Sequence, residues 1–155
     1  MVIVGNGPLE DLVRMYCSRY PDKLEFLGKI PHVRMPELYS AVDIVLLPRP
    51  SHEAAQSYVP IKLMEALAME KIVLGSDVDG LKQVIDDGIT GILYRQGDAQ
   101  DFIRQVSHIT REGPSLRGVG KEGRNKVLKH FEWDCSRSAL TLAYAAAKKR
   151  KNASR

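Results

Sequence analysis

Pro60, Lys62 and Glu65 are residues whose types and spacing could do chemistry together. They stand in the run Pro60–Ala68, which precedes the apolar stretch Ile72–Leu74 and predicts a short helix leading into a buried strand. Proline suits the first helical position, and the bare N–H groups of a helix start favour an anion such as a diphosphate. Lys62 adds a positive charge one turn in, and the Glu65 carboxylate can accept hydrogen bonds from sugar hydroxyls. The alternative is a solvated ion pair on an ordinary helix.

Predicted strands and helices alternate along the chain with short connections. Apolar runs predict strands at residues 1–5, 24–27, 44–47, 72–74 and 91–94. Helical patterns fall at residues 9–19, 35–42, 60–69, 80–85, 99–110, 116–129 and 134–148. Asp98 is the expected N-cap of the helix at residues 99–110. This order predicts an α/β fold, a Rossmann-like parallel sheet with helices on both faces.

Ligands of such sheets bind at the carboxyl edge of the strands. The loops predicted at this edge are Gly5–Pro8, Gly28–Ile30, residues 48–59 and residues 76–80. The helix start at Pro60 faces the same crevice. We therefore expect these segments to form one candidate site.

The net charge of +4 comes from the C-terminal tail, whose basic residues are Lys148, Lys149, Arg150, Lys151 and Arg155. The rest of the chain is slightly acidic, which argues against a nucleic-acid partner. We expect residues 1–147 to form the domain and residues 148–155 to be a disordered basic tail. Peripheral contact of this tail with an anionic membrane is the second interpretation.

Cysteine and histidine positions give no sign of a disulfide framework or a metal site. Cys17 and Cys135 fall in predicted helices, and the four histidines are scattered. We therefore expect no metal and no cofactor. The sequence shows no signal peptide and no apolar run of about 20 residues, which predicts a cytoplasmic protein, membrane-associated only through its tail.

Three further patterns have a structural explanation. Gly5-x-Gly7 lacks the third glycine of a dinucleotide fingerprint. Asp77-x-Asp79 imitates a metal-binding motif, but its position in a glycine-containing loop predicts a turn. Phe131 and Trp133 are expected to anchor the core.

The order and spacing of several segments resemble the C-terminal, donor-binding domain of group 1 retaining glycosyltransferases, which have the two-domain GT-B architecture. The segments are Val2–Pro8, Phe26–Gly28, Tyr39–Pro48, the P-x-K-x-x-E helix from Pro60, Gly80–Gly91 and the pair Phe131 and Trp133.

The resemblance implies a half-site for a nucleotide-sugar donor. A UDP- or GDP-linked sugar would be transferred with retention of configuration, without a required metal, to an acceptor that the sequence does not identify. The backbone of Gly28–Ile30 would meet the base, and N–H groups near Ile61 would meet the diphosphate. Lys62 and Glu65 are the expected catalytic residues, with Glu65 on the ribose. The expected donor-binding residues are Gly5, Gly7, Gly28, Lys29, Ile30, Ser57, Tyr58, Val59, Pro60, Ile61, Lys62 and Glu65.

Two positions depart from the family pattern. Ser57 stands where many relatives carry a glutamate beside the donor sugar. Glu70-Lys71-Ile72 stands where relatives have glycine and proline after the signature helix. A helix that ends without glycine costs about 1 kcal/mol where a left-handed residue is needed.

The family's domain begins with a further strand that bears a basic pair for the diphosphate, and a separate N-terminal domain binds the acceptor. Neither the further strand nor the N-terminal domain has a counterpart in this sequence. We therefore expect a separate N-terminal domain or chain as partner, and weak or no sugar transfer by this chain alone. Residues 1–5 should then be partly exposed. Two alternatives stay open: a non-catalytic nucleotide-sugar-binding or scaffolding module, and a nucleotide-sugar isomerase or epimerase.

Overall fold

The computed structural model describes residues 1–50 and 58–153, and the chain divides into two compact units, Met1–Ala41 and Val42–Arg155. The domain limits expected from the sequence, 1–147 and 148–155, therefore stay predictions.

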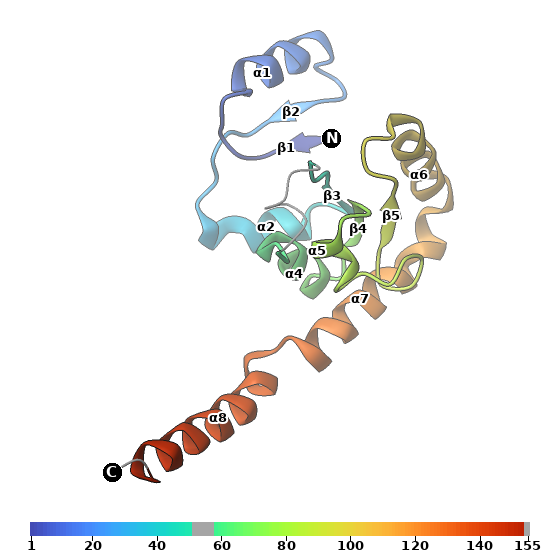
Figure 1. The fold of residues 1–155 in the computed structure, drawn as a ribbon. Helices are drawn as coiled ribbons and strands as arrows, with labels where there is room; N and C mark the ends of the chain where they lie inside the picture. The colour runs from blue at the N-terminus through green and yellow to red at the C-terminus, as the bar shows by residue number, and fades with distance from the viewer. Residues whose placement is uncertain (51–57, 154–155) are drawn as a thin grey trace. The chain divides into compact units, whose positions relative to one another are not determined.

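The first unit is built on two short parallel strands, with Val2 opposite Glu25 and Ile3 opposite Phe26. Among residues 1–41 only Tyr39 is buried. Met1 is 63% exposed, which agrees with the partial exposure expected for residues 1–5. The elements are β1 (Val2–Ile3), α1 (Glu10–Arg19), β2 (Glu25–Phe26), the 3-10 helix η1 (His32–Arg34) and α2 (Met35–Ser40) (Figure 1).

The second unit contains a three-stranded parallel sheet in the order β3-β4-β5. Ile44 lies opposite Ile72, and Leu74 lies opposite Ile92. Its elements are β3 (Ile44–Leu47), α4 (Ile61–Ala68), β4 (Ile72–Ser76), α5 (Asp79–Lys82), β5 (Ile92–Tyr94), α6 (Ala99–Glu112), the 3-10 helix η2 (Gly113–Leu116), α7 (Arg117–His130) and α8 (Trp133–Ala153) (Figure 1).

Helices cover both faces of this sheet, as the sequence predicts. All five residues of β4 are buried, because β4 is the central strand. Side chains alternate between the faces of a strand. On one face Leu74 packs in a cluster with Ile92 and Ile109, the latter from α6. On the other face Leu81 from α5 reaches Gly75, so closely that a Cβ on Gly75 would lie 2.5 Å from it.

Two glycines of α7 let this helix dock on the C-terminal end of α4. A Cβ on Gly120 would overlap the Glu70 carbonyl oxygen, and one on Gly123 would lie 2.7 Å from the Leu67 side chain. The Arg124 guanidinium donates to the carbonyl of Ala68, where the helix dipole favours a cation. α7 therefore fixes the end of the helix that carries Lys62 and Glu65.

The end of α4 requires a left-handed residue, at a position where this chain has no glycine. Glu70 has φ 59°. Its amide donates to the carbonyl of Leu67 at 2.9 Å, and the Lys71 amide donates to Ala66 at 3.0 Å. This is the Schellman pattern that usually employs glycine.

The C-terminal helix differs from two expectations. Trp133 is 74% exposed and Phe131 is 41% exposed, so neither anchors the core of the described chain. The last helix was predicted to end at residue 148, yet α8 extends to Ala153. The alanines and lysines at this point are strong helix formers, which accounts for the extension. No helix within residues 1–50 and 58–153 is both long and apolar enough to cross a membrane.

Candidate functional site

The predicted phosphate-binding helix is present, and it begins one residue later than expected. Pro60 is the N-cap, with φ −73° and ψ 138°, and the helix starts at Ile61. The prediction that Pro60 occupies the first helical position is therefore wrong, because its ψ is extended. The Pro60 carbonyl still accepts the first turn's hydrogen bond, from the Leu63 amide at 3.0 Å.

One face of α4 is buried and the other is open. Leu63, Ala66 and Leu67 are fully buried. On the opposite side Ile61 is 71% exposed, Lys62 is exposed and Glu65 is half-buried. Residues three and four apart lie on the same helix face. Ile61, Lys62 and Glu65 consequently share the open face, while the sheet holds the helix through its other face.

The first turn of α4 has the chemistry of an anion site. Pro60 provides no side-chain cap, and the first turn contains no acidic residue. The first amides of a helix lack partners within the helix and carry its positive dipole end. With Lys62 in the same turn, the open face combines helix amides, an ammonium group and, one turn on, the Glu65 carboxylate.

The carboxyl ends of the three strands of this sheet meet around Arg49, which lies in the loop 48–59 that the sequence predicts at this edge. The Arg49 amide donates to Ser76 Oγ at 2.9 Å, and Gln96 Nε2 donates to the Arg49 carbonyl at 3.2 Å. Ser76 ends β4, and Gln96 follows β5. Next to Ser76, burial raises the pKa of the Tyr94 phenol, with a further rise from nearby Asp77. The only sequence signal at Arg49 is a cation between two prolines.

In the first unit, the glycine turns after β1 and β2 meet each other. The Gly5 amide donates to the Gly28 carbonyl at 2.8 Å. Gly5 has φ 143° and Gly28 has φ 63°, conformations that favour glycine. Gly7 and Lys29 are exposed, and Ile30 is half-buried.

The expected site residues thus fall into two groups. Gly5, Gly7, Gly28, Lys29 and Ile30 lie in the first unit. The second unit holds Tyr58, Val59, Pro60, Ile61, Lys62 and Glu65, which are consecutive or on one helix face. Tyr58 is 54% exposed, Val59 is half-buried and Pro60 is buried. Ser57 lies outside the described residues.

The Asp77-x-Asp79 pattern, predicted as a turn, connects β4 to α5, and Asp79 is the first residue of α5. Asp77 Oδ1 accepts a hydrogen bond from the Gln96 amide at 2.8 Å, and Asp79 Oδ1 pairs with Lys82 at 3.0 Å. Within residues 1–50 and 58–153, no three histidine, cysteine, aspartate or glutamate side chains gather as metal ligands would.

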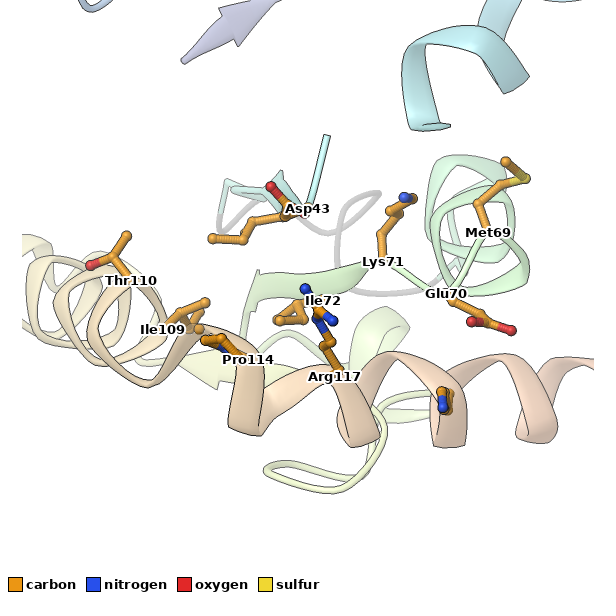
Figure 2. Close-up of a pocket in the computed structure, with 12 residues that line it drawn as sticks. Asp43, Met69, Glu70, Lys71, Ile72, Ile109, Thr110, Pro114 and Arg117 are labelled. Carbon is orange, nitrogen blue, oxygen red and sulfur yellow. The ribbon is translucent and has the colours of Figure 1, made fainter. Parts of the chain in front are cut away.

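A cavity of about 620 Å³ opens at the opposite, amino edge of the sheet in the second unit. Asp43 and Ile72 line it from the strand starts, and Thr110 lines it from the end of α6. Figure 2 shows Arg117 extending from α7 toward Ile72. None of the predicted donor-binding residues lines this cavity.

Comparison with known proteins places this chain in a family. The family model described as "Glycosyl transferases group 1" matches residues 1–112. The putative colanic acid biosynthesis glycosyltransferase WcaL of Salmonella typhimurium is 27% identical over 133 residues, covering 83% of this chain and 33% of WcaL. The D-inositol 3-phosphate glycosyltransferase of Nocardia farcinica is 30% identical over 129 residues, covering 81% of this chain and 27% of that enzyme. The chain therefore spans about a third or less of the length of these curated relatives.

The fold has a counterpart among solved structures. Anabaena HepE, crystallised with UDP, superposes with a TM-score of 0.76 at 18% identity, covering 92% of this chain and 40% of HepE. At this identity the likeness shows the fold alone, the Rossmann-like α/β fold of GT-B glycosyltransferases. Since the family match extends over well more than half of the sequence, the chain belongs to the group 1 glycosyltransferases.

Proposed function

We propose that the chain is the donor-binding part of a retaining glycosyltransferase, which transfers a sugar from a UDP- or GDP-sugar to an acceptor. The observation that carries the proposal is the start of α4. Its N-cap residue, Pro60, makes no side-chain cap hydrogen bond, and Ile61, Lys62 and Glu65 share the open face of the helix. HepE, which has the same fold, was crystallised with UDP, and this supports a nucleotide donor. The retaining stereochemistry rests on the family resemblance.

The chemistry of α4 suits the departure of a diphosphate. When the bond from the sugar to the donor oxygen breaks, negative charge builds up on the diphosphate. Helix amides and the Lys62 ammonium stabilise this charge as it develops. The Glu65 carboxylate accepts hydrogen bonds from the two ribose hydroxyls, which orients the nucleotide along the helix. Lys62 thus stabilises the leaving diphosphate, and Glu65 binds the ribose of the donor.

The assignment of the nucleobase to the glycine turns of the first unit rests on the family resemblance alone. In this proposal the Gly28–Ile30 backbone binds the nucleobase, and Gly5 and Gly7 keep the neighbouring turn free of side chains. Transfer by residues 1–155 alone is expected to be weak, because closed, water-excluding clefts usually need a second domain. The proposed partner is an acceptor-binding domain or chain.

Titration calorimetry of the full chain with UDP and GDP tests the donor class. We expect one of the two to bind, and Glu65→Ala to weaken that binding about tenfold or more, because the ribose loses a charge-assisted acceptor. Lys62→Ala should weaken UDP or GDP more than the free nucleoside. Lys121→Ala is the matched control, because Lys121 is exposed on the amino-edge cavity. Absence of binding to both nucleotides at millimolar concentration would contradict the proposal.

A sugar-transfer assay distinguishes the proposed enzyme from the alternative, a non-catalytic nucleotide-sugar-binding module. An acceptor-binding domain supplied in trans should restore sugar transfer, and Glu65→Ala should reduce donor affinity and transfer together. If transfer in the reconstituted system is unaffected by Glu65→Ala, the partner performs the chemistry and the chain is a scaffold.

A further inference from the structure

One face of α8 carries a stripe of large exposed side chains. Trp133 is 74% exposed, Leu140 is 47% exposed and Tyr144 is 80% exposed. These residues are spaced i, i+7 and i+11, so helix geometry puts them on one face. Two exposed basic residues, Arg137 and Lys148, fall on the same face at i+4 and i+15. This set of five residues, the Trp133 face, alternates apolar or aromatic groups with cations.

The charges of α8 have one sign beyond its first turn. Asp134 is the last acidic residue of the sequence, and its Oδ1 lies 3.5 Å from Nη1 of Arg137. All charged side chains after Asp134 are basic, and four of them are consecutive, at residues 148–151. The helical backbone continues through this basic run to Ala153. The basic run and the exposed aromatic residues therefore belong to one helix, whose charge fits an anionic partner.

The residue types of the Trp133 face suit the boundary between water and a bilayer. Tryptophan and tyrosine have an apolar body and a polar tip, and both are enriched at membrane–water interfaces. Arginine and lysine lay their apolar stems along such a surface while their charged groups stay in water. Leu140 in the middle of the stripe favours lipid over a nucleic acid, because a nucleic-acid face needs cations along its length to meet the phosphates.

We propose that the Trp133 face of α8 binds an anionic membrane surface. The helix lies in the plane of the interface, with Trp133, Leu140 and Tyr144 at the boundary between headgroups and acyl chains. Anionic headgroups attract the basic run, and burial of the apolar stripe adds to this attraction, so two signals act together. Membrane contact is thus assigned to an ordered helix face as well as to the basic tail expected from the sequence. The inference goes beyond the proposed function and does not depend on it.

Trp133 is the only tryptophan of the chain, so its fluorescence reports directly on the proposed contact. With vesicles of phosphatidylglycerol and phosphatidylcholine, we expect the full chain to co-sediment and the Trp133 emission to move to shorter wavelength. Vesicles of phosphatidylcholine alone should bind about tenfold more weakly or less, because they lack anionic headgroups. Raising the salt from about 0.1 M to about 1 M shortens the screening length from about 10 Å to about 3 Å and should release most of the bound chain.

A matched pair of leucines on α8 tests which face makes the contact. Leu140→Ser removes an apolar side chain from the Trp133 face and should weaken binding to the anionic vesicles about tenfold. Leu142→Ser makes the same change at a residue that is 71% exposed on the opposite side of the helix. It should change vesicle binding less than about twofold. Circular dichroism checks that both variants keep the helix.

Several results would overturn the inference. One is the absence of binding to the anionic vesicles at millimolar lipid and about 0.1 M salt. Another is an equal loss of binding in Leu140→Ser and Leu142→Ser. Binding without any change in the Trp133 emission would mean that the basic run alone attaches the chain, which also contradicts a role for the helix face. Binding to single-stranded RNA by a chain that has no affinity for vesicles would assign α8 to a nucleic acid instead.

Discussion

The docking of α7 on α4 predicts opposite outcomes for the same substitution at two glycines of one helix. Gly120 is buried, and an added Cβ would overlap the Glu70 carbonyl oxygen. Gly118 is exposed, and an added Cβ there meets no atom within 4 Å. Both residues lie in α7, so both changes to alanine gain the same helix propensity, up to about 1 kcal/mol.

The two variants should differ because only one adds a steric cost. Overpacking a tight contact costs about 1–3 kcal/mol, and a backbone carbonyl cannot rotate away as a side chain can. Gly120→Ala should therefore destabilise the chain by about 1–2 kcal/mol net, while Gly118→Ala should stabilise it by up to about 1 kcal/mol. The melting temperatures of the two variants should differ by about 5–10 °C.

Urea and thermal unfolding followed by circular dichroism measure this difference. Because α4 carries Lys62 and Glu65, Gly120→Ala should also weaken nucleotide binding, whereas Gly118→Ala should leave it unchanged. Equal stability of the two variants, or a more stable Gly120→Ala, would refute the close approach of α7 to the end of α4.

Three further variants test local features of the second unit. Glu70→Gly should stabilise the chain by about 1 kcal/mol relative to Glu70→Ala, because φ 59° strains any residue with a Cβ. Both variants lose the ion pair between Glu70 and Arg124, whose Nε lies 3.7 Å from the carboxylate, so equal stabilities would contradict the strain. Asp98→Ala should cost about 1 kcal/mol in urea unfolding, since Asp98 Oδ1 caps the Asp101 amide at 2.9 Å. The pKa of Asp101 is held below its ordinary value of 3.8, first by the Arg95 amide and then by Arg104. Its contribution to stability is full above that pH and is lost as pH falls toward the lower folded pKa, so Asp101→Asn should flatten the acid limb of the stability curve.

Local chemistry made much of the fold predictable from the sequence. The strand Ile44–Leu47 was predicted with the bounds that the structure has, because Asp43 and Pro48 mark its ends. Asp98 caps α6 as predicted, by a contact three residues along the chain. The aromatic pair was misjudged for a different reason. Burial of Trp133 requires some other segment to cover it, and no local pattern states whether one does.

The candidate site was predictable as far as it is local. Pro60, Lys62 and Glu65 lie within six residues, and helix geometry alone puts Lys62 and Glu65 on neighbouring positions. The loop 48–59 was predicted at this edge, but the contacts of Arg49 were not, because its partners Ser76 and Gln96 are 27 and 47 residues away. A loop residue gains its role only when the sheet brings such distant strand ends together.

The direction of the helices in the second unit explains why the start of α4 is a better anion site than the amino-edge cavity. In a strand–loop–helix unit, the helix runs back across the sheet, so its start lies at the carboxyl edge and its end at the amino edge. α4 and α6 both end at the amino-edge cavity, which Glu70 and Thr110 line, and α7 begins there. Two helix ends against one helix start favour cations over anions at this edge. Lys71, Arg117 and Lys121 line this cavity and supply the cations that such helix ends favour. The start of α4 has the opposite polarity, and for this reason Lys121→Ala should leave nucleotide binding intact while Lys62→Ala should not.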